Sequence, residues 1–243
     1  MTDRRSTAAL LIAFTALNFV AVMVLGAAFG WPAVLDEPAA VVLPAFAAAQ
    51  GPVVAGFLLQ TMLSVALVPI AIGLHQQFVS RASGEGPRLW PLTVAVFGIL
   101  AGLTQTLGWI RWPLTVPGLA ATWLDPATSP EVRTATEVSY DLLNSYAGGA
   151  LGEYLGWSFQ ALWAVGIAVL LVRTRVVSAV TAVAGLVLTA AWGLSFLVGP
   201  FYPALADGVA GTAGFTAYAA WFCWLGVVGV ALLRQAPALV DAR

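Results

Sequence analysis

Two charged residues lie at the edges of otherwise apolar stretches, and their side chains are the best candidates for chemistry. Arg111 comes 22 residues after Leu89, where one apolar stretch begins, and Glu153 comes 20 residues before Arg173, where another ends. If both stretches cross a membrane in opposite directions, the two charges lie at a similar depth near one boundary. Turned inward, each would lose hydration, and pairing offsets part of that loss. The alternative is that both are hydrated at the interface, with Arg111 snorkelling outward.

Further polar and aromatic side chains recur at helical spacing around these two charges. Gln105 precedes Arg111, Trp157 and Gln160 follow Glu153, and Asn144, Tyr146 and Tyr154 are close in sequence. Polar groups in hydrocarbon face other helices, so they either join helices together or line a ligand pocket, and both interpretations stay open. The candidate ligand-binding residues are Arg111, Glu153, Gln105, Trp157 and Tyr146.

Standard motifs of enzymes and metal proteins are missing from the sequence. It contains no Gly-rich phosphate loop, no Gly-x-Ser-x-Gly elbow and no His-Glu-x-x-His. A single cysteine, Cys223, excludes an internal disulfide, and together with the single histidine, His75, it excludes a Cys/His zinc cluster. We therefore expect no metal and no cofactor, and Glu153 is the candidate for a general acid.

The elements that must position these residues follow from composition. Of the 243 residues, 60% are hydrophobic and 9% are charged, against about 25% charged in soluble domains. A net charge of −1 offers no basic surface for a nucleic acid. About 20 apolar residues span a bilayer as a helix, and six stretches qualify: Ala8–Gly30, Val53–Leu74, Leu89–Ile110, Ala150–Val172, Val176–Gly199 and Gly211–Leu233. The sequence predicts one polytopic domain over residues 1–243, an all-α bundle of six transmembrane helices.

The arginines predict the orientation of this bundle. Alternate connections place eight arginines on one side and two, Arg111 and Arg133, on the other. The arginine-rich side is cytoplasmic by the positive-inside rule, so both termini are expected in the cytoplasm of a cell-membrane protein. Arg4 and Arg5 before an apolar run would also suit a signal peptide, but the run exceeds the usual core of about 7–15 residues.

Two outer connections are expected to contain short interfacial helices. Asp36-Glu37-Pro38 is typical of a helix start, and Gly51-Pro52 would close a helix over 41–49. Ser129-Pro130-Glu131 is a second start, which predicts a helix over 130–147 that Gly148-Gly149 would interrupt.

Aromatic residues are abundant, with 10 tryptophans. Trp112 lies near the end of a span, where an interfacial belt is expected. Five tryptophans lie deeper, where they either line a cavity or form ordinary packing: Trp157, Trp163, Trp192, Trp221 and Trp224.

The stretch from Gly98 to Trp163 resembles a family of bacterial multi-pass membrane proteins that is catalogued as a domain of unknown function. The resemblance is carried by Arg111-Trp-Pro, Val116-Pro and Gly152-Glu-Tyr-Leu-Gly. It implies a membrane protein and suggests no reaction. Tyr154 stands where the family pattern has a histidine, so the resemblance implies no histidine-based metal or acid–base site here.

Three functions remain open for the chain. The first is a membrane protein that binds a hydrophobic or amphiphilic small molecule in an outward-facing cavity. The second is a membrane enzyme acting on a lipid or isoprenoid-like substrate with Glu153 as acid. The third is a structural or regulatory partner in the lipid bilayer. The sequence leaves the oligomeric state undefined.

Overall fold

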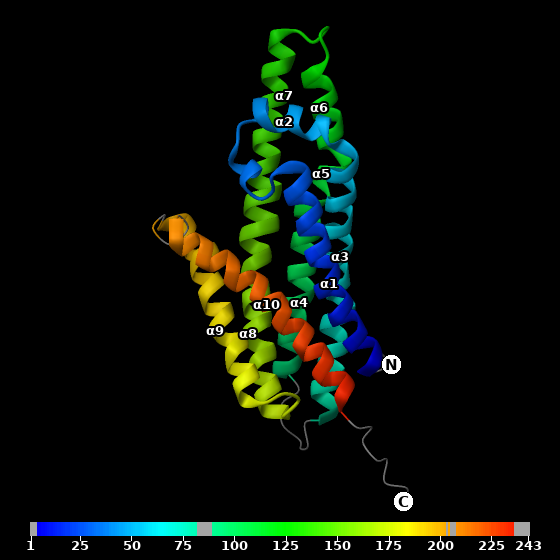
Figure 1. Cartoon of the computed structure of the whole chain (residues 1–243), viewed down its shortest axis with the longest axis vertical. Helices are drawn as coiled ribbons and strands as arrows, with labels where there is room; N and C mark the ends of the chain where they lie inside the picture. Colours follow the sequence, from blue (N-terminus) through cyan, green and yellow to red (C-terminus); the bar gives the residue numbers. More distant parts are fainter. Residues whose placement is uncertain (1–3, 82–88, 203, 205–207, 236–243) are drawn as a thin grey trace, which may run out of the picture. The chain divides into compact units, whose positions relative to one another are not determined.

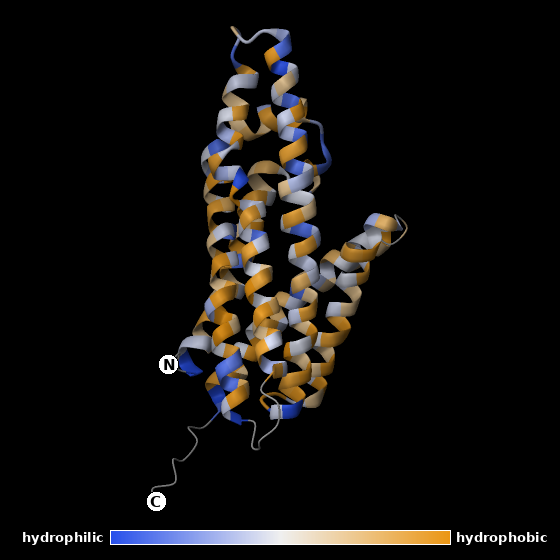
Figure 2. Ribbon diagram, turned by 180° about the vertical axis from the view of Figure 1, so that it is seen from behind, coloured by the Kyte–Doolittle hydropathy of each residue, from blue (hydrophilic) through white to orange (hydrophobic). Residues whose placement is uncertain are grey.

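The computed structural model describes residues 4–81, 89–202, 204 and 208–235. All regular elements within this part of the chain are helical, which confirms the predicted all-α fold. Six helices are long and apolar enough to cross a membrane, and Figure 2 shows that hydrophobic residues dominate them. They cover Arg4–Phe29, Gln50–Arg81, Leu89–Leu124, Pro130–Thr174, Ala179–Phe201 and Gly208–Arg234. The chain is therefore a multi-pass integral membrane protein.

Three of these helices are continuous and three are composite (Figure 1). The continuous helices are α1 (Arg4–Phe29), α3 (Gln50–Arg81) and α10 (Gly208–Arg234). The third comprises α4 (Leu89–Trp109), α5 (Arg111–Leu114) and α6 (Val116–Leu124). The fourth comprises α7 (Pro130–Leu143), the π-helix η2 (Asn144–Leu155) and α8 (Gly156–Thr174). The fifth comprises α9 (Ala179–Gly193), the π-helix η3 (Leu194–Val198) and the 3-10 turn η4 (Gly199–Phe201).

Contacts divide the chain into two compact units. Unit 1 consists of Met1–Thr15, Pro69–Ala95 and Trp163–Arg243, and unit 2 consists of Ala16–Val68 and Val96–Leu162. The prediction of a single domain over residues 1–243 stays a prediction.

Unit 2 is built around an aromatic core. The short helix α2 (Ala39–Ala48) packs against α6 and α7, as Figure 1 shows. The Trp112 ring stacks on Phe57 with centroids 4.7 Å apart and meets Phe29 edge-on at 5.2 Å. Tyr140 reaches the same ring from α7. Because Trp112 is fully buried in this core, its predicted place in an interfacial belt is wrong.

The outer connections follow the predicted starts only in part. Ser129 caps α7 by accepting a hydrogen bond from the Val132 amide, as predicted. The short helix starts earlier than expected, with Pro38 at its N-cap position and Asp36 in a separate 3-10 turn (Ala33–Asp36). The short helix ends at Ala48, close to its predicted end, but the break lies at Ala49 and not at Gly51-Pro52, because Gly51 and Pro52 lie in the first turn of α3. Proline is tolerated there, since its missing N–H would have no helical partner.

Unit 1 contains the packed hairpin of α9 and α10 (Figure 1). Gly185 on α9 leaves room for the Trp224 ring, where a Cβ atom would clash. The Trp224 indole then donates to the Thr181 carbonyl at 2.8 Å. Trp192 and Trp221 are fully buried, and their ring centroids lie 6.0 Å apart. The deep tryptophans of unit 1 therefore form ring-to-ring packing, one of the two interpretations left open by the sequence.

Candidate functional site

Arg111 is a buried cation in unit 2, and only 4% of its surface is exposed. It begins α5, which a single residue, Ile110, separates from the end of α4. Its Nη1 donates to the Gly108 carbonyl at 2.5 Å, and its Nη2 donates to Asn144 Oδ1 at 3.0 Å. Asn144 in turn donates from Nδ2 to the Leu35 carbonyl at 3.1 Å. The guanidinium thus connects the end of α4 to the start of η2, and Asn144 extends this connection to the turn before α2.

Glu153 lies half-buried in η2 and attracts Arg111 through space. The exposed carboxylate of Asp36 repels the Glu153 carboxylate. The hydrogen bonds of Arg111 go to Gly108 and Asn144, so Arg111 and Glu153 interact as neighbouring charges and not as a hydrogen-bonded pair. The sequence pattern proposed Arg111 and Glu153 as a pair, and the structure decides that Asn144 holds the guanidinium.

Glycines in η2 and at the start of α8, on the helix that faces α4, explain how a large cation fits at this position. A Cβ atom on Gly148 would clash with the Arg111 guanidinium. A Cβ atom on Gly152 would lie 2.7 Å from the Gly108 Cα atom, and one on Gly156 would lie 2.8 Å from Gln105 Cγ. Glycine at every fourth residue therefore lets this helix approach α4 closely, as small residues do in membrane proteins.

The predicted interruption at Gly148-Gly149 is wrong. Both residues lie inside η2, and the chain is helical from Pro130 to Thr174. Glycine weakens a helix by about 0.5–1 kcal/mol relative to alanine. Here the close contact of Gly148 with Arg111 gives a reason for that cost. The spacing of Gly148, Gly152 and Gly156 is a signal that would have identified this contact face from the sequence.

Three buried donors around Arg111 have no hydrogen-bond partner among the described residues. They are Arg111 Nε, Trp112 Nε1 and the Tyr140 hydroxyl. Trp112 is fully buried and Tyr140 is 2% exposed. The Arg111 guanidinium lies 5.3 Å from the centroid of the Trp112 ring, and the rings of Trp112 and Tyr140 are 6.3 Å apart. Buried polar groups are nearly always satisfied, so a cluster of three such donors calls for an explanation.

The other predicted site residues have different places. Gln105 is buried and donates to Gln160 Oε1 at 2.5 Å, which shows it joining α4 to α8. Trp157 is half-buried in the first turn of α8. Tyr146 is 62% exposed and lies outside the buried cluster. Tyr140, at a position with no motif, was missed by sequence reasoning. We call Arg111, Trp112, Tyr140, Asn144 and Glu153 the Arg111 site.

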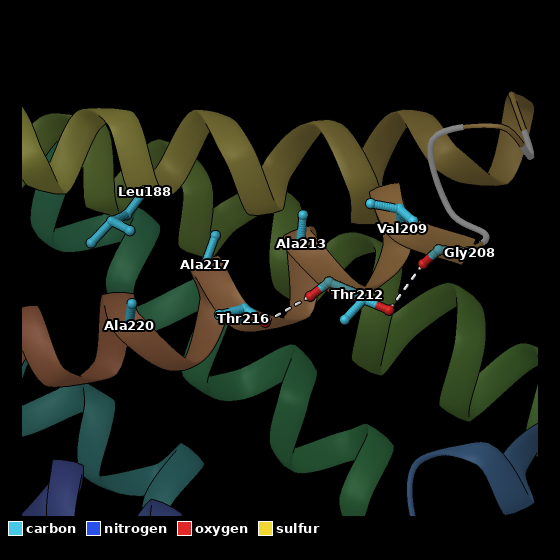
Figure 3. A pocket seen from close by; sticks show the side chains of 8 residues that line it. All are labelled: Leu188, Gly208, Val209, Thr212, Ala213, Thr216, Ala217 and Ala220. Carbon is cyan, nitrogen blue, oxygen red and sulfur yellow. Dashed lines mark hydrogen bonds between the residues drawn. The ribbon is translucent and has the colours of Figure 1, made fainter.

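Unit 1 also contains a hollow of about 730 Å³ between α9 and α10. Figure 3 shows the small side chains that line it, with Thr212 and Thr216 on α10. Their hydroxyls donate to the Gly208 and Thr212 carbonyls of the same helix at 2.9 and 2.8 Å. The hollow is therefore apolar and presents no group for chemistry.

Within the described ranges, no group of three or more His, Cys, Asp or Glu side chains is placed to hold a metal ion. The Arg111 site consists of donors, one amide and one carboxylate. Such a set can bind and orient a polar head group, and its single carboxylate can accept or donate a proton.

Comparison with known proteins identifies a family for most of the chain. A family model described as a domain of unknown function, DUF4386, matches residues 7–229. No curated protein matches the chain, and no solved structure matches it.

Proposed function

The chain belongs to the DUF4386 family, and we propose that it is a multi-pass cell-membrane protein that binds an amphiphilic ligand at the Arg111 site. The single observation that supports binding is the buried Arg111 beside donors that lack partners. Burying a charge and leaving donors unsatisfied both reduce stability. A bound head group that accepts those hydrogen bonds would offset the loss.

Asn144 is the residue that would keep the geometry of such a site fixed. It holds the Arg111 guanidinium from one side while its own amide donates to Leu35. Side chains held by a second layer of hydrogen bonds keep their geometry when a ligand enters or leaves. The aromatic core that surrounds Trp112 would contact the apolar part of the ligand.

Glu153 supports the enzymatic alternative, in which the ligand is a lipid or isoprenoid-like substrate. It is a half-buried carboxylate, and burial is one way in which enzymes tune a carboxyl group for proton transfer. The Glu153→Gln variant separates the two functions. It should retain a bound ligand if the site only binds, and it should accumulate unreacted substrate if Glu153 is an acid.

The test of binding is to purify the protein from native membrane and identify co-purifying small molecules by mass spectrometry. Asn144→Ala is the informative variant, because it releases the guanidinium and leaves the charge in place. An amphiphile enriched with the wild type and lost from Asn144→Ala supports the proposal. Equal lipid profiles for the two proteins would refute it.

The proposed orientation places both termini in the cytoplasm, because eight of the ten arginines would then lie on that side. Cysteine labelling on a Cys223→Ala background tests it at two exposed serines. Ser139→Cys should react with an impermeant reagent added to sealed cells, and Ser80→Cys should react only after lysis. The reverse pattern would overturn the orientation.

A further inference from the structure

The three buried atoms without partners at the Arg111 site can all donate a hydrogen bond. Arg111 Nε–H and the Trp112 indole N–H can only donate, and the Tyr140 hydroxyl can donate as well as accept. Every one of these atoms is buried. A ligand that satisfies them must present acceptor oxygens. An alkylammonium head, which has no acceptor, would leave at least Arg111 Nε–H and the Trp112 indole N–H unsatisfied.

The charges at the site limit the ligand further. The positive charge of Arg111 acts on Glu153, and Asp36 adds a second negative charge nearby. Glu153 already compensates the positive charge of Arg111, which leaves little of that charge for an added anion. A carboxylate or phosphate head would have to compete with Glu153 for the same guanidinium, and its own desolvation would be only partly repaid.

The walls of the site favour a flat or apolar group. Trp112 stacks on Phe57 at 4.7 Å, and Phe57 also stacks on Trp109 at 5.8 Å. Phe29 closes the other side of the Trp112 ring at 5.2 Å. Trp112 is fully buried among these rings, so a flat conjugated group or an acyl chain would have to pack beside them by offset or edge contacts.

We infer that the Arg111 site binds the neutral carbonyl head group of an amphiphile. A carbonyl oxygen has two lone pairs and can accept from two of the three buried donors at once. It carries no charge, so it leaves the attraction between Arg111 and Glu153 in place. The same chemistry occurs in the ester carbonyl of a glycerolipid and in the carbonyl of a quinone. This inference rests on the proposed binding function.

The test compares head groups on chains of matched length. Purified protein in detergent is titrated with methyl decanoate, decanoate and decyltrimethylammonium, and the dissociation constants are measured by calorimetry. Methyl decanoate should bind about tenfold more tightly than either charged probe. Dioctanoylglycerol and decylubiquinone then distinguish the two sources, since the natural class should bind more tightly than methyl decanoate.

Tyr140→Phe tests whether the buried donor is used. The variant should weaken binding of the carbonyl probe about two- to tenfold, the loss of one hydrogen bond. It should leave the unfolding temperature of the ligand-free protein unchanged or higher, because it removes a buried hydroxyl without a partner. Tyr202→Phe is the matched control, since it removes the same hydroxyl from a side chain that is 64% exposed.

The outcomes separate the two proposals. Tighter binding of decanoate or of the ammonium probe would overturn the carbonyl inference and leave the binding function standing. Equal carbonyl binding by Tyr140→Phe and Tyr202→Phe would also overturn the inference. Failure of every probe to bind, natural classes included, would overturn both proposals together.

Discussion

A single added methyl group at Gly152 should separate the two helices that form the Arg111 site. A Cβ atom built there lies 2.7 Å from the Gly108 Cα atom. Carbon atoms in good contact are about 3.5–4.0 Å apart, so Gly152→Ala requires a separation of roughly 1 Å. The obstacle is backbone on both sides, and a rotamer change cannot relieve it. Gly149→Ala is the matched control in the same π-helix, because the nearest atom that its Cβ would meet, the Asn144 carbonyl oxygen, is 3.9 Å away.

The cost of Gly152→Ala can be estimated from two contributions. Overpacking at a close contact costs about 1–3 kcal/mol. Separation by roughly 1 Å would also stretch the Gln105–Gln160 hydrogen bond from 2.5 Å to the limit of hydrogen bonding, a loss of about 0.6 kcal/mol for such bonds in membranes. Alanine returns about 0.5–1 kcal/mol through its better helix propensity. The net loss is therefore about 1–3 kcal/mol.

The assay is thermal unfolding in detergent followed by intrinsic fluorescence, since the chain has 10 tryptophans. A loss of 1 kcal/mol lowers the unfolding temperature by about 2–4 °C in a protein of this size, so Gly152→Ala should unfold roughly 2–12 °C lower than wild type. Gly149→Ala should unfold at or above the wild-type temperature. Equal effects of the two variants would refute the close approach of Gly152 to Gly108 and would point to a general intolerance of alanine in η2.

Two further predictions concern buried polar groups of unit 2. Arg111→Gln should destabilise the protein more than Glu153→Gln, because it removes two hydrogen bonds. The double mutant should lose about 0.5–1 kcal/mol less stability than the two single variants lose together. Additive losses in thermal unfolding would show that the two charges are independent. Gln160→Leu should cost about 1–3 kcal/mol by leaving the Gln105 amide without its acceptor. Gln105→Leu/Gln160→Leu should recover much of that loss, and a double mutant less stable than Gln160→Leu would contradict this account.

Local patterns predicted the ends of several elements correctly and others incorrectly. Ser129 was identified as a cap because its hydroxyl satisfies an amide of the first turn, an interaction within four residues. The same local rules predicted breaks at Gly51-Pro52 and Gly148-Gly149, but the first break lies at Ala49 and the second is absent. Proline in a first turn and glycine at a helix contact are both compatible with a helix, and only the surroundings show which case applies.

The sequence by itself determined the membrane class, the six spans and the candidate charges Arg111 and Glu153. These depend on the length of apolar runs compared with bilayer thickness and on the cost of charges near hydrocarbon, and both are properties of short segments. The tertiary structure alone decided that Asn144 holds Arg111, that Gly148 makes room for it, and that Trp112 belongs to the core. The side chains of Arg111 and Asn144 are 33 residues apart in sequence. Which faces of their helices meet depends on packing that helical periodicity leaves open.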